Sequence, residues 1–152
     1  MTRNSFLRYI VSLIVGVLAF GSTAPSIPVQ AASGDAAGAR WIMISLTRQT
    51  LYAYQGNTIV FSMAVNAYGT ARGNFRVQNK IRFAPFVGRG TLPYWLGVYF
   101  VGHGVQNGIH GPWSRGGRIT TSSLGCVVIR SSANAARLFG WAYPGIPVSI
   151  HW

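Results

Sequence analysis

The chain has 152 residues, of which 13 are Lys or Arg and only one is acidic, giving a formal net charge of +12. With Asp35 as the single carboxylate, the chain lacks the paired acids of glycosidases and aspartic proteases, the acid of a Ser-His-Asp triad and the oxygen ligands of hard metal ions. Arginines without internal partners predict an anionic environment, which could be nucleic acid, anionic lipid or an anionic cell wall.

The first 31 residues have the order of a secretory signal. Arg3 and Arg8 precede an apolar run over residues 9–20, and a Val-Gln-Ala pattern ends at Ala31. The alternative is a membrane anchor, but about a dozen apolar residues are fewer than the ~20 that span a bilayer. We therefore expect cleavage after Ala31, no membrane span afterwards, and export to the cell wall, periplasm or another extracytoplasmic space. Export argues against nucleic acid as the physiological partner.

The remaining chain is expected to hold one domain. Residues 32–39 are rich in Ala, Gly and Ser, which predicts a flexible linker, and residues 40–152 are enough for one hydrophobic core. Removal of Arg3 and Arg8 with the signal leaves 11 basic residues against one acidic residue, a net charge of about +10.

Taken in chain order, the domain is predicted to consist mainly of strands. Apolar, β-branched and aromatic runs predict strands at 40–46, 50–55, 58–65, 74–78, 94–101, 107–111 and 146–152. Gly56-Asn57 predicts a tight hairpin, and the Gly- and Pro-containing segment 83–93 predicts a loop. Residues 132–141 predict one helix, capped by Ser131 and ended by Pro144-Gly145. The fold class is mainly β, a sandwich or barrel-like sheet with one short C-terminal α-helix.

Cys126 is the only cysteine of a chain expected to be exported. A lone thiol has no disulfide partner within the chain, which makes it a candidate nucleophile. A small buried apolar residue and half of an intermolecular disulfide are the alternatives. The preceding Gly125 allows close approach of a substrate, and backbone N–H groups there can form an oxyanion hole.

His110, sixteen residues before Cys126, is the candidate base. An imidazole beside the thiol is needed to generate a thiolate at neutral pH. Because no carboxylate is available, a backbone carbonyl or a hydroxyl would have to orient the ring. One cysteine and three scattered histidines do not make a metal site, so we expect no metal and no cofactor.

The pair Ile109-His110-Gly111 and Ser123-Leu124-Gly125-Cys126 resembles the signature of the L,D-transpeptidase catalytic domain (YkuD type). The likeness extends over 40–152. It includes an opening hairpin, a glycine segment at 65–75, an aromatic strand at 93–95 and a closing Gly-Ile-Pro-Val run at 145–148. The resemblance implies an L,D-transpeptidase-like β-sandwich of mixed sheets.

The resemblance also implies a reaction. Cys126 would attack the L,D-peptide bond of a peptidoglycan tetrapeptide stem and release the terminal D-alanine. His110 would activate the thiol, the Gly111 carbonyl would orient His110, and the N–H groups of Gly125 and Cys126 would hold the oxyanion. The thioester would pass to a diamino-acid amine of a neighbouring stem, forming a 3-3 cross-link.

Further residues are expected to contact the substrate. They are Ser123, Trp113, Tyr94, Arg118 and Arg130, of which Arg118, together with Arg115 on the same glycine-rich loop, is placed to pair with stem carboxylates. Three places depart from the family pattern: Leu124 stands where His or Lys is common, Val128 where Arg or Asn is usual, and Ala71-Arg72 where the glycine segment has Thr-Pro. Arg130, on the same strand face as Val128, could partly substitute for the missing polar group.

Three readings therefore remain. The first is an exported monomeric cysteine transpeptidase acting on stem peptides, or an L,D-carboxypeptidase if water is the acceptor. The second is a catalytically degenerate module that binds the cell wall. The third is a basic secreted protein that acts on anionic surfaces or on nucleic acid. Anionic cell-wall polymers are expected partners beside the stem peptides.

Overall fold

The computed structural model describes residues 38–152, so the predicted signal at 1–31 and most of the predicted linker at 32–39 lie outside the described residues. Eleven strands and one α-helix make up this part of the chain. They are β1 (Arg40–Ser45), β2 (Thr50–Gln55), β3 (Thr58–Asn66), β4 (Gly73–Arg76), β5 (Asn79–Phe86), β6 (Gly90–Val101), β7 (Val105–His110), β8 (Trp113–Arg115), β9 (Arg118–Thr120), β10 (Val127–Ile129), α1 (Ser132–Trp141) and β11 (Pro147–His151). A short 3-10 turn, η1 (Gly102–Gly104), separates β6 from β7. No helix within 38–152 is long and apolar enough to cross a membrane.

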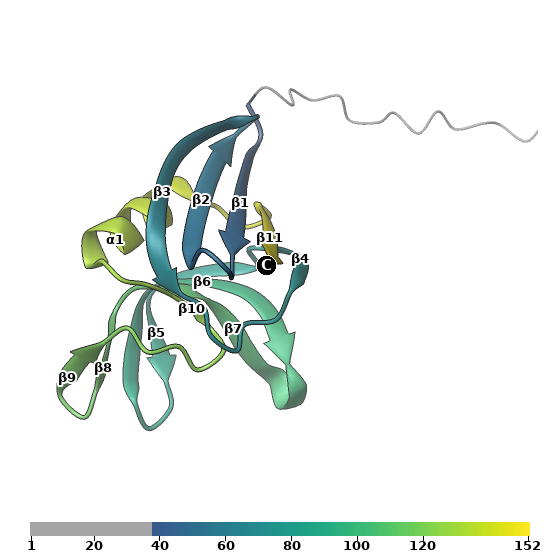
Figure 1. The fold of residues 1–152 in the computed structure, drawn as a ribbon. Coiled ribbons are helices and arrows are strands. Elements are labelled where there is room, and N and C mark those ends of the chain that lie inside the picture. Colours follow the sequence, from purple (N-terminus) through teal and green to yellow (C-terminus); the bar gives the residue numbers. More distant parts are fainter. Residues whose placement is uncertain (1–37) are drawn as a thin grey trace, which may run out of the picture. The chain divides into compact units, whose positions relative to one another are not determined.

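Nine strands form one mixed sheet in the order β4-β11-β1-β2-β3-β10-β7-β6-β5. The sheet has two halves, a first half of β4, β11, β1, β2 and β3 and a second half of β3, β10, β7, β6 and β5. The strand β3 belongs to both halves, since Ala64 pairs with β2 while Val65 and Asn66 pair with β10. Two pairings are parallel, β1 with β11 and β7 with β10. Figure 1 shows β1, β2 and β3 side by side in one layer, β5, β6 and β7 in another, and α1 beside them. The predicted mainly-β sandwich with one C-terminal helix is confirmed.

The main core lies between the two halves of the sheet. Ile42, Ile44 and Leu51 come from the first half, and Ile109 and Val127 from the second, each with an exposed fraction of 2% or less. Leu138 and Ala135 of α1 join the same cluster. A smaller apolar cluster lies on the other face of the second half, formed by Ala84, Leu92, Trp95, Trp113 and Val128. The candidate site is built over this smaller cluster.

The predicted helix is confirmed at its N-terminus. α1 begins at Ser132, and the hydroxyl oxygen of Ser131 accepts a hydrogen bond from the Asn134 N–H at 3.4 Å. Such a cap satisfies one of the amide groups that the first helical turn leaves without a partner.

The predicted loop at 83–93 is wrong, because this segment forms most of a hairpin. β5 extends to Phe86 and β6 begins at Gly90, with Phe83 paired to Pro93 and Pro85 to Thr91. Proline is tolerated because β5 is an edge strand, and β6 before Leu96 pairs with β5 alone. The glycine-rich segment between His110 and Cys126 also pairs, as the hairpin of β8 and β9.

A core substitution tests this layering. Ile44→Ala removes a side chain with no exposed surface and should lower the free energy of unfolding by about 3 kcal/mol. Ile119→Ala, on β9 with 74% exposure, is the matched control and should cost less than about 0.5 kcal/mol. Urea denaturation followed by circular dichroism measures both. Equal losses in the two variants would contradict the assigned core.

Candidate active site

The parallel pairing of β7 with β10 brings Cys126 and His110 to one face of the sheet. Val127 pairs with Ile109, and Val128 pairs with His110. Side chains alternate along a strand, so Cys126, Val128 and His110 share the face of the smaller apolar cluster. Ile109 and Val127 point into the main core. The sequence interval of sixteen residues is taken up by the hairpin of β8 and β9.

His110 is buried, with an exposed fraction of 2%, and its ring is oriented by backbone. Its Nδ1 lies 2.7 Å from the carbonyl oxygen of Gly111. A carbonyl only accepts, so Nδ1 carries the hydrogen and Nε2 is left as the basic nitrogen. The Trp95 ring lies nearly parallel to the imidazole, with centroids 6.0 Å apart. Burial lowers the pKa of His110 to about 4, against the opposing effect of the Gly111 carbonyl.

Gly111 is fixed from both sides. Its N–H donates to the carbonyl oxygen of Pro93 at 2.8 Å. A Cβ at this position would lie 3.0 Å from the Cβ of Ala135, so any side chain would press against α1. The close approach of α1 therefore explains the glycine, and the same packing holds the carbonyl that orients His110.

Cys126 is half-buried immediately before β10. Its Sγ lies 3.7 Å from Oδ1 of Asn107. Burial raises the pKa of the Cys126 thiol, and the backbone N–H of Gly108 opposes that change. Taken with the lowered pKa of His110, the resting pair is a neutral thiol and a neutral imidazole.

Asn107 is a site residue that the sequence interpretation missed. Besides the thiol contact, its Nδ2 donates to the Tyr99 hydroxyl at 3.4 Å. Its neighbour Cys126 is nineteen residues away, and no spacing rule links the two positions. Only the pairing of β7 with β10 brings Asn107 to the thiol and identifies it as a site residue.

The turn before Cys126 is held by hydroxyl groups. The Ser123 oxygen accepts from the Gly125 N–H at 3.2 Å and lies 2.6 Å from the Cys126 carbonyl oxygen, to which it donates. The Tyr99 hydroxyl donates to the Gly125 carbonyl at 2.9 Å. Gly125 has φ +103°, a left-handed conformation that L side chains rarely adopt. The structure thus places Ser123 in the support of this turn.

A cleft of about 520 Å³ opens beside Cys126. It is lined by Ile81, Ala84, Pro85, Phe86, Val87, Leu92, Trp95, Gly104, Val105, Gln106, Asn107, Leu124 and Cys126. Leu124 is half exposed at its rim. All of these lining residues are uncharged, although the chain is strongly basic.

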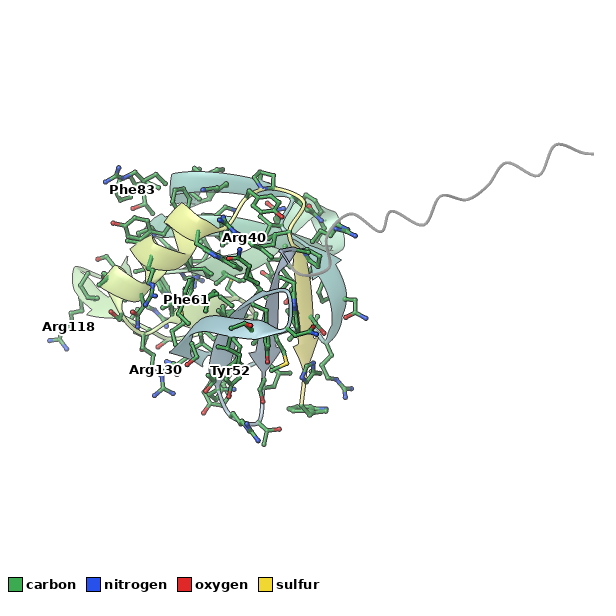
Figure 2. The ribbon with its side chains drawn as sticks, turned by 90° about the horizontal axis from the view of Figure 1, so that it is seen from above. Arg40, Tyr52, Phe61, Phe83, Arg118 and Arg130 are labelled. Atoms are coloured by element: carbon green, nitrogen blue, oxygen red, sulfur yellow. The ribbon has the colours of Figure 1, made fainter. Side chains whose placement is uncertain are left out.

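Four residues predicted to contact substrate lie elsewhere. Trp113 is buried against Phe86 beneath the cleft, and Tyr94 packs on Phe139 of α1. Arg118 is exposed on β9, and Nε of Arg130 donates to Asn66 at 3.0 Å. Figure 2 shows the guanidinium groups of Arg118 and Arg130 pointing outward from the fold. In this structure the aromatic residues that line the cleft are Phe86 and Trp95.

Within residues 38–152 no group of three or more His, Cys, Asp or Glu side chains could hold a metal ion. The arrangement offers a thiol, an imidazole with a free basic nitrogen, and a largely apolar cleft. These groups suit acyl transfer through a thioester.

Solved structures share this fold at low sequence identity. L,D-transpeptidase 1 of Mycobacterium tuberculosis is 22% identical, with a TM-score of 0.61 over 74% of this chain and 61% of that chain. An L,D-transpeptidase of Stackebrandtia nassauensis is 21% identical, with a TM-score of 0.62 over 75% of this chain and 56% of that chain. The present chain thus spans about three-fifths of the length of these relatives.

No curated protein matches the chain. The sequence profile of the L,D-transpeptidase catalytic domain (YkuD) matches residues 39–150, which cover nearly all of the described part. The chain therefore belongs to the L,D-transpeptidase catalytic domain family.

Proposed function

We propose that the protein is an exported cysteine L,D-transpeptidase that cross-links peptidoglycan stem peptides. The observation that carries the proposal is the 2.7 Å contact between Nδ1 of His110 and the Gly111 carbonyl. It frees Nε2 as a base on the sheet face that also carries Cys126 beside the cleft. This arrangement needs no carboxylate, which agrees with a domain that contains none.

In the first half-reaction, Cys126 Sγ attacks the carbonyl carbon of the L,D-peptide bond in a tetrapeptide stem. The thiol proton passes to Nε2 of His110, a new S–C bond forms and the C–N bond to D-alanine breaks. The imidazolium then protonates the leaving amine. A neutral thiol and a neutral imidazole are the correct starting states for this transfer, because a protonated His110 could not accept the proton.

The oxyanion is proposed to be held by backbone N–H groups at Gly125 and Cys126. The Gly125 N–H donates to Ser123 at 3.2 Å, near the long end of the hydrogen-bond range. A developing oxyanion is a stronger acceptor than a hydroxyl and can replace this contact.

In the second half-reaction, the side-chain amine of a diamino acid on a neighbouring stem attacks the thioester. His110 takes a proton from that amine, the C–S bond breaks, and the thiol regains its proton. The product is a 3-3 cross-link. The apolar walls beside Cys126 favour an amine over water, since they offer few hydrogen-bond partners for a bound water molecule.

The place of action is proposed from the first 31 residues and from charge. A signal at 1–31 would deliver a monomeric domain, 40–152, beyond the cytoplasmic membrane, without a remaining membrane span. The basic surface would then face anionic cell-wall polymers rather than nucleic acid.

Covalent labelling tests the nucleophile. A carbapenem should add its own mass to the reduced protein, because the strained lactam carbonyl acylates an activated thiol. One solved L,D-transpeptidase structure is in complex with imipenem. Intact-mass spectrometry should show one adduct, lost in Cys126→Ala and slowed about a hundredfold in His110→Gln. His151→Gln, on β11, is the matched control and should react at the normal rate.

No adduct on folded, reduced protein would overturn the enzymatic proposal. It would favour the alternative of a degenerate wall-binding module. That alternative draws support from Val128, an apolar and fully buried residue at the position where the family pattern has Arg or Asn.

Acid stability tests the neutral state of His110. Its folded pKa of about 4 lies below the ordinary value of 6.5, so the unfolded chain binds the proton more tightly between these values. The stability from the neutral ring is complete above pH 6.5 and is lost as the pH falls toward 4. Between pH 7.5 and pH 5 the protein should lose about 2 kcal/mol in urea denaturation.

His110→Gln should abolish most of this loss, whereas His151→Gln should keep it. Carboxylates contribute little, because residues 38–152 contain no Asp or Glu. Identical pH profiles for His110→Gln and the unmodified protein would contradict the assignment.

Product analysis distinguishes the transferase from the hydrolase. Incubation with tetrapeptide muropeptides should yield 3-3 linked dimers and free D-alanine, measured by liquid chromatography and mass spectrometry. Tripeptides without dimers, at an amine concentration that saturates the acceptor, would assign the L,D-carboxypeptidase reaction instead.

A further inference from the structure

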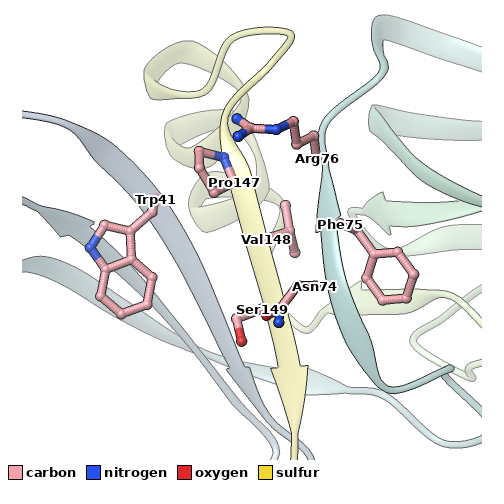
Figure 3. Close-up of a pocket in the computed structure, with 7 residues that line it drawn as sticks. All are labelled: Trp41, Asn74, Phe75, Arg76, Pro147, Val148 and Ser149. Carbon is pink, nitrogen blue, oxygen red and sulfur yellow. The ribbon is translucent and has the colours of Figure 1, made fainter. Parts of the chain in front are cut away.

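A second hollow of about 490 Å³ lies on the outer face of the first half of the sheet (Figure 3). It is lined by Trp41, Asn74, Phe75, Arg76, Pro147, Val148 and Ser149. None of these residues lines the cleft beside Cys126. We call this hollow the Trp41 groove.

Three neighbouring strands form the groove. β11 is its floor, with β1 on one side and β4 on the other. Ile42 and Val148 pair and face the core, so by alternation Trp41, Pro147 and Ser149 face outward. Adjacent strands lie about 4.8 Å apart, which makes the groove about 10 Å wide. That width fits one sugar ring or one flat side chain.

Trp41 forms a rigid wall. Its indole stacks on Tyr54 with ring centroids 4.0 Å apart and planes 10° from parallel. Nε1 donates to the Gly56 carbonyl at 2.9 Å, which fixes the rotation of the ring. Tyr54 covers one face of the indole, and Figure 3 shows the ring beside β11. The ring is therefore held in place before any ligand arrives.

The opposite wall is polar and positive. Arg76 is exposed, and Nη1 donates to the Gly145 carbonyl at 2.8 Å, which uses one of five guanidinium N–H groups. Asn74 is exposed beside it and pairs through its backbone with Ser149. Since residues 38–152 contain no acidic side chain, Arg76 has no carboxylate side chain to neutralise it in the described part of the chain.

A second cation stands at the far end of the groove. Arg72 precedes β4 and lies over the Trp152 ring at 5.1 Å. His151, two residues after Ser149, continues the outward face of β11 toward this pair. Guanidinium groups thus occur at both ends of the groove floor, and the Trp41 indole lies along one side.

We propose that the Trp41 groove binds an acidic glycan, a chain of sugar rings that carries carboxylates. The C–H face of a sugar ring is slightly positive and packs on the negative face of an indole. The Asn74 amide and the Ser149 hydroxyl suit sugar hydroxyls, and Arg76 suits a carboxylate. A polyanion without rings would leave Trp41 unused. The site does not depend on Cys126 chemistry, and only the choice of peptidoglycan glycan as probe rests on the proposed function.

Binding is best measured in full-length Cys126→Ala protein, so that no turnover occurs. The probes are peptidoglycan glycan strands whose stems have been removed, neutral chitohexaose, and poly-L-glutamate, compared by isothermal titration calorimetry. Trp41→Ala should weaken glycan and chitohexaose binding about tenfold and leave polyglutamate unchanged. Arg76→Gln should weaken binding of the acidic glycan about tenfold and leave chitohexaose unchanged. Arg137→Gln on α1 removes the same charge elsewhere and should retain the glycan affinity.

Three results would overturn the proposal: no glycan binding, glycan binding unaffected by Trp41→Ala, or an equal loss of glycan affinity in Arg76→Gln and Arg137→Gln. If Trp41→Ala fails to fold, Ser149→Tyr makes the same test, because its ring would occupy the groove floor and should abolish binding. Carbapenem labelling of Trp41→Ala with Cys126 intact should be normal. Failure of the glycan site is therefore distinguishable from failure of the Cys126 chemistry.

Discussion

The candidate site depends on the parallel pairing of β7 with β10. That pairing sets Val128 against His110, and the period of two along each strand then places Cys126 on the same face. A shift of register by one residue would send either the thiol or the imidazole into the main core. The register is held because Ile109 and Val127, on the opposite face, are both buried there.

The shortage of carboxylates shapes the rest of the site. In a domain without Asp or Glu, only a neutral hydrogen-bond acceptor can orient the imidazole of His110, and the Gly111 carbonyl has this role. A carbonyl stabilises a protonated imidazole less than a carboxylate does, and burial disfavours the charge further, so the ring stays neutral. The same shortage leaves the arginines available to external anions, which is the basis for the proposed glycan groove.

The sequence allowed much of this to be predicted, with failures that have identifiable causes. The apolar and β-branched runs of β1 to β3 and the capped helix α1 could be predicted because each is a local pattern. Pro85 and Pro93 misled the interpretation of 83–93, since proline excludes central pairing but not an edge hairpin.

Contacts between distant residues were harder to predict. Cys126 and His110 stood out by residue type, whereas Asn107 did not, because its contact with the Cys126 thiol arises from sheet pairing alone. Tyr94 and Trp95 are adjacent, and only the structure shows that Trp95 is the one beside the cleft. The arginines were expected at the substrate, yet the residues lining the cleft are uncharged.

The central claim is that His110 rests as a neutral ring with hydrogen on Nδ1 and a free Nε2. Nitrogen-15 NMR of labelled protein measures this state directly, because protonated and bare ring nitrogens have well separated shifts. We predict one protonated and one bare ring nitrogen for His110 at pH 7, with the hydrogen on Nδ1, and the same state at pH 5. An imidazolium at pH 7, or hydrogen on Nε2, would contradict the account.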